Sequence, residues 1–156
     1  MEFSIISEMF EMMEKTTKRI ELTNILVELL KKTPKKIIPN VVYLLQGIIR
    51  PNFEGVELGI AEKLAIRAIS KSAGLPIKKI EDDYRDGGDL GLTASNILKI
   101  KTQTTFTAEK ITVERVYETL FKIAKLEGKG SQDLKMKYIS SLLNDATPLE
   151  AKFLLK

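Results

Sequence analysis

Apolar residues recur along most of this chain at the three- and four-residue spacing that places them on one face of a helix. In the first such segment, Phe3, Ile6, Phe10 and Met13 would share a face. β-Branched alternation never lasts long enough to indicate a strand. We therefore predict an all-α fold of many helices. The predicted helices cover about 2–15, a segment that ends before Pro34, then 36–47, 58–73, 77–84 and 89–100, and three segments introduced by Thr112, Ser131 and Thr147.

The start of the last helix carries the clearest local signal. Thr147, Pro148 and Glu150 supply a threonine at the N-cap, a proline at the first helical position and a glutamate at the third. This order is typical of a capping box with a favourable first-turn proline. Ser131 follows a glycine-rich turn and is predicted to be the N-cap of the helix that begins there.

The polar, threonine-rich stretch 101–111 predicts an exposed loop. The length of 156 residues suits one domain, which this loop could divide into two helical lobes, residues 1–100 and 112–156. No apolar run reaches the roughly 18–20 residues that span a bilayer, and the N-terminus lacks the pattern of a signal peptide. We therefore predict a cytoplasmic protein without a membrane partner.

The chain contains no cysteine and no histidine. Disulfides and a thiolate nucleophile are excluded, as are the usual zinc sites, the Ser-His-Asp triad and the commonest general base. The sequence therefore excludes an enzyme that depends on cysteine or histidine chemistry.

Basic residues gather near the N-terminus. Between Lys15 and Lys36 there are seven basic residues and only two acidic ones, although the whole chain has a formal net charge of only +4. The acidic residues cluster instead at 81–89. A one-sided basic surface attracts nucleic acid or an anionic membrane surface, while a run of charge can equally be a solvated face.

The sequence contains a candidate internal repeat. Residues 17–30 align without a gap on residues 130–143, and after loops of different length 41–45 align on 151–155. This alignment predicts an approximate internal two-fold repeat of helix pairs, each introduced by a short polar or basic loop. Two unrelated amphipathic helices could align as well, so this alternative stays open.

Both copies of the repeat begin with small, hydroxyl or basic residues at a predicted helix start. The first amides of a helix have no intrahelical partner and lie at the positive end of its dipole, so they suit phosphate. Two such starts could hold both backbones of a duplex without reading its sequence. The candidate DNA-binding residues are Thr17, Lys18 and Arg19 in the first copy and Gly128, Lys129, Gly130, Ser131, Lys135 and Lys137 in the second.

Several stretches of the chain resemble the N-terminal domain of archaeal and eukaryotic ATP-dependent DNA ligases. The resemblance covers nearly the whole chain in the family's order, so we expect residues 1–156 to be a ligase-type DNA-binding domain. It implies a helical, internally symmetric domain that binds the minor-groove side of nicked duplex DNA during replication, repair and recombination. It also implies that the catalytic and OB-fold domains of the same ligase are partners. The matching stretches are Val42–Gly47, Glu57–Lys63, Gly88–Gly91, Thr112–Tyr117, Gly128–Ser131 and Pro148–Leu154.

The sequence also departs from the ligase pattern. The family's Lys-x-Asp-Gly motif supplies the lysine that becomes adenylated, and the nearest string here, Tyr84–Gly87, has tyrosine in that place. We interpret this string as a turn. The fragment is therefore expected to lack enzymatic activity and to need no cofactor, while ATP and magnesium belong, by resemblance, to the parent ligase.

The second copy of the repeat is shorter than the first. The first copy continues through Leu58–Glu62, whereas the second has no counterpart before Lys156. By resemblance, the missing segment carries a DNA-contacting arginine. We therefore expect a fragment that ends inside the last element of the domain, with weaker DNA binding than the intact domain.

Residues 101–106 resemble a short sliding-clamp motif that some archaeal ligases carry in this loop. The resemblance implies that Gln103 enters a polar pocket of the clamp and Phe106 a hydrophobic one. The family form often has a second aromatic residue, where this chain has Thr107. A polar loop with one phenylalanine is commonplace, so the interpretation of this stretch as a sliding-clamp motif stays open. The alternative function is a helical protein-interaction module, for example one that binds a sliding clamp, with an incidental basic surface.

Overall fold

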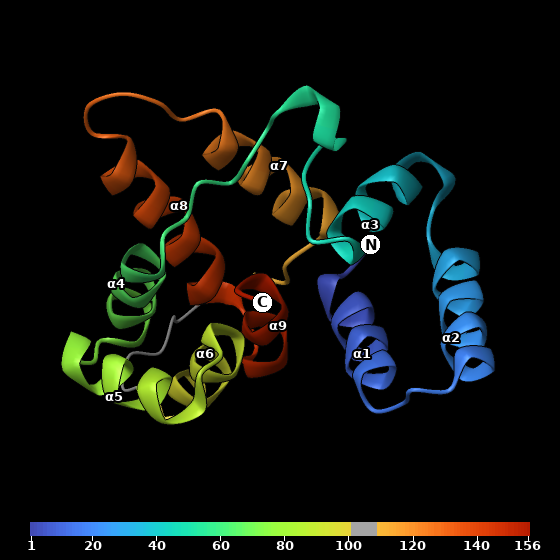
Figure 1. Ribbon diagram of the computed structural model, residues 1–156, viewed down its shortest axis with the longest axis horizontal. Helices are drawn as coiled ribbons and strands as arrows, with labels where there is room; N and C mark the ends of the chain where they lie inside the picture. The colour runs from blue at the N-terminus through green and yellow to red at the C-terminus, as the bar shows by residue number, and fades with distance from the viewer. Residues whose placement is uncertain (101–108) are drawn as a thin grey trace.

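The computed structural model describes residues 1–100 and 109–156, and every regular element in these two ranges is helical (Figure 1). The all-α prediction is therefore confirmed. The predicted clamp residues Gln103 and Phe106 lie outside the described residues. The elements are α1 (Phe3–Glu14), α2 (Arg19–Lys32), η1 (Lys35–Ile37), α3 (Ile38–Leu45), η2 (Asn52–Glu54), α4 (Glu62–Ala73), α5 (Ile77–Gly87), α6 (Leu90–Lys99), α7 (Val113–Ala124), α8 (Ser131–Asp145) and α9 (Pro148–Leu154).

Two helix boundaries differ from the predicted ones. Helix α4 begins at Glu62 rather than near residue 58, because Gly59 has a φ of +56° and cannot lie inside a right-handed helix. Helix α5 continues through Tyr84–Gly87, so the interpretation of this string as a turn was wrong. The left-handed Gly88 ends α5 only afterwards, and the Tyr84 hydroxyl donates a hydrogen bond to Glu62 at 3.1 Å.

The helix caps follow the local sequence with one exception. The Thr147 side chain accepts from the Glu150 amide at 3.2 Å while the Glu150 carboxylate accepts from the Thr147 amide at 2.8 Å, so the predicted capping box is confirmed. Thr112 caps α7 as expected. Ser131 was wrongly predicted as a cap, because Gly130 occupies that position with a φ of +85° and Ser131 is the first helical residue.

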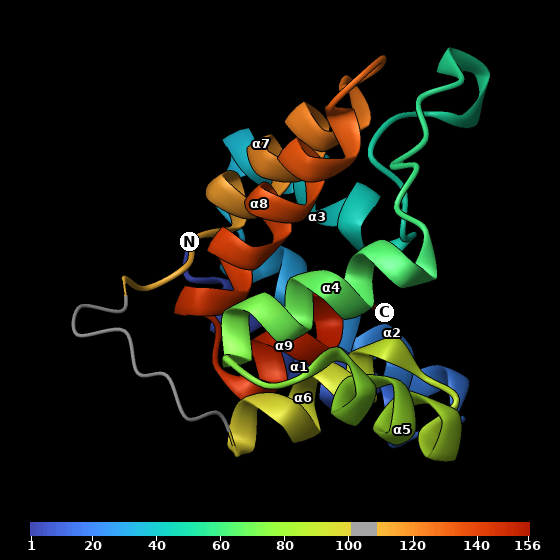
Figure 2. The ribbon, with the colours of Figure 1, turned by 90° about the vertical axis from the view of Figure 1, so that its left-hand side faces the viewer.

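The helices share one hydrophobic core. It includes residues from both predicted lobes, such as Ile6, Ile69, Ile97, Ile123 and Leu143, so the two lobes pack through common side chains. Helix α9 lies in the middle of the view, between α6 and α1, while α4 packs along α8 (Figures 1 and 2). Within the described residues, no helix is long and apolar enough to cross a membrane.

The backbones of α6 and α9 come close together at Gly91 of α6. A Cβ atom on Gly91 would lie 2.3 Å from the backbone oxygen of Lys152 in α9. Only glycine therefore permits the two backbones to come this close, and the contacts between α6 and α9 are the most extensive of any helix pair.

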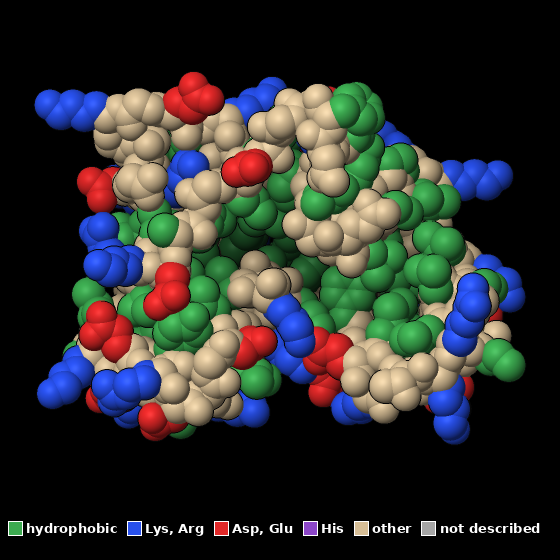
Figure 3. All heavy atoms as spheres, viewed as in Figure 1, with side chains coloured by type: hydrophobic (Ala, Val, Ile, Leu, Met, Phe, Trp, Pro, Cys, Tyr) green, Lys and Arg blue, Asp and Glu red, His purple; other side chains and the backbone are tan. Residues whose placement is uncertain are grey.

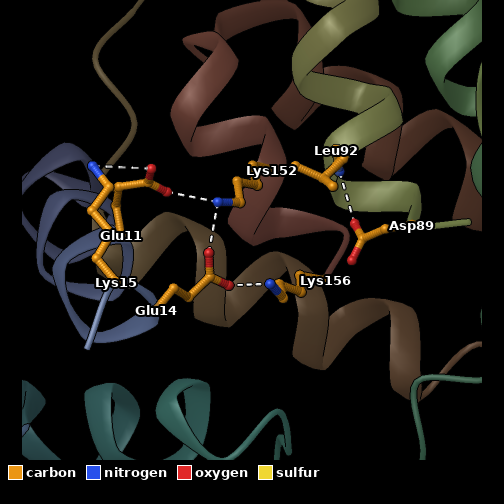
Figure 4. Close-up of polar contacts among 7 residues, drawn as sticks. All are labelled: Glu11, Glu14, Lys15, Asp89, Leu92, Lys152 and Lys156. Atoms are coloured by element: carbon orange, nitrogen blue, oxygen red, sulfur yellow. Dashed lines mark hydrogen bonds and ion pairs between the residues drawn. The ribbon is translucent and has the colours of Figure 1, made fainter. Parts of the chain in front are cut away.

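The Lys152 side chain attaches α9 to α1 by ion pairs. Its ammonium donates to the carboxylates of Glu11 and Glu14, at 2.6 Å each, and Glu14 also pairs with Lys156 (Figure 4). The hydrogen bond from Lys152 holds the pKa of Glu11 below its usual value. Burial raises the pKa of Glu14, but hydrogen bonds from Lys152 and Lys156 outweigh it, so this pKa is lowered too. Burial lowers the pKa of Lys152, but its two glutamates outweigh this effect and raise it.

We predict that Gly91→Ala destabilises the fold by about 1–3 kcal/mol, the usual cost of forcing extra atoms into a packed contact. The added methyl would push α6 away from α9. Gly87→Ala is the matched control, because it lies at the end of a helix with no atom within 4 Å of its Cβ position. Chemical denaturation measures both variants. Equal stabilities of Gly91→Ala and the native chain would contradict the close packing.

We predict that the ion pairs around Lys152 make stability fall in acid. Because the pKa values of Glu11 and Glu14 are lowered by folding, their contribution is present above about pH 4.3 and is lost as the pH falls through the lowered values. A Glu11→Gln, Glu14→Gln double variant should be less stable than the native chain at pH 7 and approach it at pH 3. Glu8→Gln, on the exposed side of α1, is the control. A stability difference that does not change with pH would refute this origin.

Candidate nucleic-acid interface

The first predicted loop, Thr17–Arg19, is exposed and leads from α1 into α2, of which Arg19 is the first residue. The Thr16 hydroxyl accepts a hydrogen bond from the Lys18 amide at 3.2 Å, and the Lys18 ammonium pairs with Glu21 at 2.8 Å. Among the described residues Arg19 has no ion pair, and no side chain caps α2. This loop therefore presents one unpaired guanidinium beside the uncapped amides of a helix start.

The second predicted loop, Gly128–Ser131, connects α7 to α8. Gly128 and Gly130 have φ values of +81° and +85°, which side-chain-bearing residues rarely adopt, so the tight reversal depends on these two glycines. The Ser131 amide donates to the Gly128 carbonyl at 3.3 Å, and no side chain caps α8. Lys129 is exposed and has no ion pair in the part of the chain that the structure describes.

The two lysines predicted in α8 have different environments. Lys137 is exposed and forms no ion pair with any described residue. Lys135 is only 6% exposed, and its ammonium donates to the carbonyl oxygens of Leu58 and Gly59 at 3.2 and 3.4 Å. The expectation that Lys135 adds surface charge is not supported, because its ammonium holds the segment before α4 against α8.

The Lys135 contact includes a glycine in the left-handed conformation. Gly59 has a φ of +56°, and a Cβ atom there would lie 2.9 Å from the Lys135 ammonium nitrogen. The sequence shows a glycine and a lysine 76 residues apart, and only the tertiary structure brings them together.

Sequence reasoning missed two basic residues of α4, one in its first turn and one in its middle. Arg67 forms an ion pair of 3.6 Å with Asp133 and so connects α4 to the first turn of α8. Lys63 is exposed and forms no ion pair with a described residue. Their spacing of four residues on one helix face was the available signal, but the contact of Arg67 with α8 is visible only in the tertiary structure.

The structure does not bring the two predicted loops together. The α7–α8 loop lies at the top in Figures 1 and 2, whereas α2 begins at the bottom of the molecule. In Figure 3, Lys and Arg side chains project around the edge of this face with Asp and Glu between them, and its centre is an apolar hollow. The two predicted loops are therefore separate sites.

We predict that Lys135→Ala lowers the free energy of unfolding by about 1–3 kcal/mol, because the carbonyl oxygens of Leu58 and Gly59 lose their donor. Lys137→Ala, on the exposed side of the same helix, should change it by less than about 0.5 kcal/mol. Denaturation of the two variants gives this comparison directly. Equal stabilities would show that the Lys135 contact contributes nothing to the fold.

The chain matches known proteins over its whole length. Residues 2–156 match the family described as DNA ligase N terminus. The chain is 73% identical to a DNA ligase of Nitrosopumilus maritimus (strain SCM1) and 62% identical to one of Cenarchaeum symbiosum (strain A), in each case over 100% of the chain and 26% of the relative. A probable DNA ligase of Aquifex aeolicus (strain VF5) is 47% identical, with the same coverage of 100% and 26%. The chain thus spans about a quarter of the length of these relatives. It belongs to the DNA ligase N-terminus family.

Proposed function

We propose that this chain binds duplex DNA without reading its sequence, as the non-catalytic N-terminal domain of an ATP-dependent DNA ligase. The observation that carries the proposal is the pair of exposed loops, each with an unpaired cation beside an uncapped helix start. Arg19 is that cation at α2 and Lys129 at α8. Membership of the ligase family makes a DNA backbone the natural polyanion for both.

The two loops offer phosphate complementary chemistry. Uncapped amides at a helix start point outward along the helix axis, where they can donate to an anion, and the helix dipole adds partial positive charge. At α8, the two left-handed glycines keep side chains away from the turn, so a phosphate reaches the backbone closely. Asp133 in this first turn would repel phosphate, and its ion pair with Arg67 reduces that repulsion.

The separation of the loops matches a role in positioning DNA. Loops at opposite ends of the molecule contact the backbone of a duplex at separate points, and such contacts fix orientation but carry no sequence information. Under this proposal, adenylation and nick sealing, with ATP and magnesium, take place in other domains of the longer protein. Those domains and the nicked duplex are its partners. The clamp motif at Gln103 and Phe106 remains a prediction from the sequence.

We predict that affinity for a nicked duplex falls steeply between roughly 50 and 200 mM salt, because bound cations are released when lysine and arginine neutralise phosphates. Lys129→Ala and Arg19→Ala should each weaken binding equally for unrelated DNA sequences and lower the slope of log affinity against log salt by about one unit. Fluorescence anisotropy with labelled duplexes measures both quantities.

Lys78→Ala is the matched control, since Lys78 is an exposed lysine on α5, away from both loops. The slope of log affinity against log salt for Lys78→Ala should equal that of the native chain. If Lys129→Ala and Arg19→Ala behave like this control, the DNA contacts lie on another face. Absence of binding even at low salt would favour the alternative of a helical protein-interaction module.

A further inference from the structure

The solvent-exposed side of α4 consists almost entirely of basic residues. From Lys63 to Ala73, the exposed residues are Lys63, Arg67 and Lys71, and every other residue of this segment is buried or half-buried. Because residues four apart lie on the same side of a helix, the three cations form one row along α4.

This row has little compensating negative charge. Glu62, the first residue of α4, accepts a hydrogen bond from the Tyr84 hydroxyl at 3.1 Å, and Asp133 of α8 pairs with Arg67 at 3.6 Å. Lys63 and Lys71 form no ion pair with any residue that the structure describes. Two of the three cations in the row are therefore available to a partner outside the fold.

A row of like charges is unfavourable for an isolated helix, because side chains four residues apart repel one another. Helix α5 shows the more usual arrangement, since it exposes Lys78 and Lys79 together with Glu81 and Asp86. Basic residues that follow one side of a helix without acidic neighbours are typical of a surface that meets a polyanion.

Helix α8 extends the row of α4 into a wider surface. The two helices pack along each other and lie side by side in Figure 2. Arg67 pairs with Asp133 in the first turn of α8, so this side of α8 borders the row. Lys137 lies one turn further along the same side and is exposed. We call Lys63, Arg67, Lys71 and Lys137 the α4–α8 basic face.

We propose that the α4–α8 basic face is a further contact for the backbone of duplex DNA, beside the loop that carries Lys129. The inference rests on the DNA binding proposed above and extends it from the helix starts to the sides of two helices. Because that loop leads directly into α8, a duplex held at Lys129 can extend over the neighbouring α4. Each cation would neutralise a phosphate, and such contacts carry no sequence information.

The chemistry of α4 fits DNA better than a protein partner. Its described residues expose no large apolar side chain, whereas the centre of a protein–protein interface is rich in apolar and aromatic residues. Interfaces with DNA are instead polar and strongly positive. The evenly spaced cations of α4 also match a partner whose negative charge repeats at short, regular intervals.

Lysine footprinting tests the proposal directly. The chain is briefly acetylated with an amine-specific reagent, with and without a nicked duplex, and the modification of each lysine is read by mass spectrometry. With duplex at about ten times its Kd, roughly a tenth of the chain is free, so Lys63, Lys71 and Lys137 should be modified about tenfold more slowly. Lys78 of α5 is the matched control, since it is an exposed lysine on the helix next to α4, and its modification rate should not change.

The salt dependence of binding gives a second measurement. A Lys63→Ala, Lys71→Ala double variant should lower the slope of log affinity against log salt by about two units, because two phosphate contacts are lost. A Lys63→Arg, Lys71→Arg variant keeps both charges and should keep the native slope. Both pairs of side chains are exposed, so chemical denaturation should show native stability for each variant.

Two results would overturn this inference and leave the proposed function standing. One is protection of Lys129 by the duplex while Lys63 and Lys71 are modified at the same rate with and without it. The other is a native salt slope in the alanine double variant. Protection of Lys78 to the same extent would also overturn the inference, because the effect would then not be confined to the α4–α8 basic face. Absence of binding by the native chain at low salt would refute the proposed function and this inference together.

Discussion

The position of α9 at the centre of the molecule depends on one close backbone contact. Gly91 of α6 lets the backbone of Lys152 approach to a distance that any side chain would prevent. The side-chain ammonium of Lys152 pairs with two glutamates of α1. Lys152 of α9 therefore contacts two helices, α6 through its backbone and α1 through its side chain. Because the ammonium is largely buried, its two carboxylates are necessary partners and not optional surface charges.

This arrangement also determines where the basic loops lie. Helices α1 and α2 lie on one side of α9 and α8 on the other, and the loops before α2 and α8 lie at opposite ends of the molecule. A rigid separation of this kind suits a domain that orients a long, stiff ligand. Two adjacent loops would instead enclose a small anion. The function we propose therefore depends on the interior of the protein as much as on its surface lysines.

Local sequence signals predicted most elements of this fold, and long-range contacts explain what they missed at the candidate site. The capping box at Thr147 and the all-α class follow from residues adjacent in the chain, so they were accessible from the sequence. The burial of Lys135 depends on carbonyls 76 and 77 residues away, which no local pattern reveals. Likewise the predicted repeat aligns α2 with α8, yet it does not reveal that α8 has more buried residues than α2. The loop positions of Arg19 and Lys129 were predicted, whereas the contribution of Arg67 required the tertiary structure.

The ion pair between Lys156 and Glu14 has a consequence for the contact between α9 and α1. Lys152 pairs with the same carboxylate, so the loss of either lysine leaves Glu14 with one partner. The energetic contributions of the two lysines are therefore coupled, and the effects of removing them would not add.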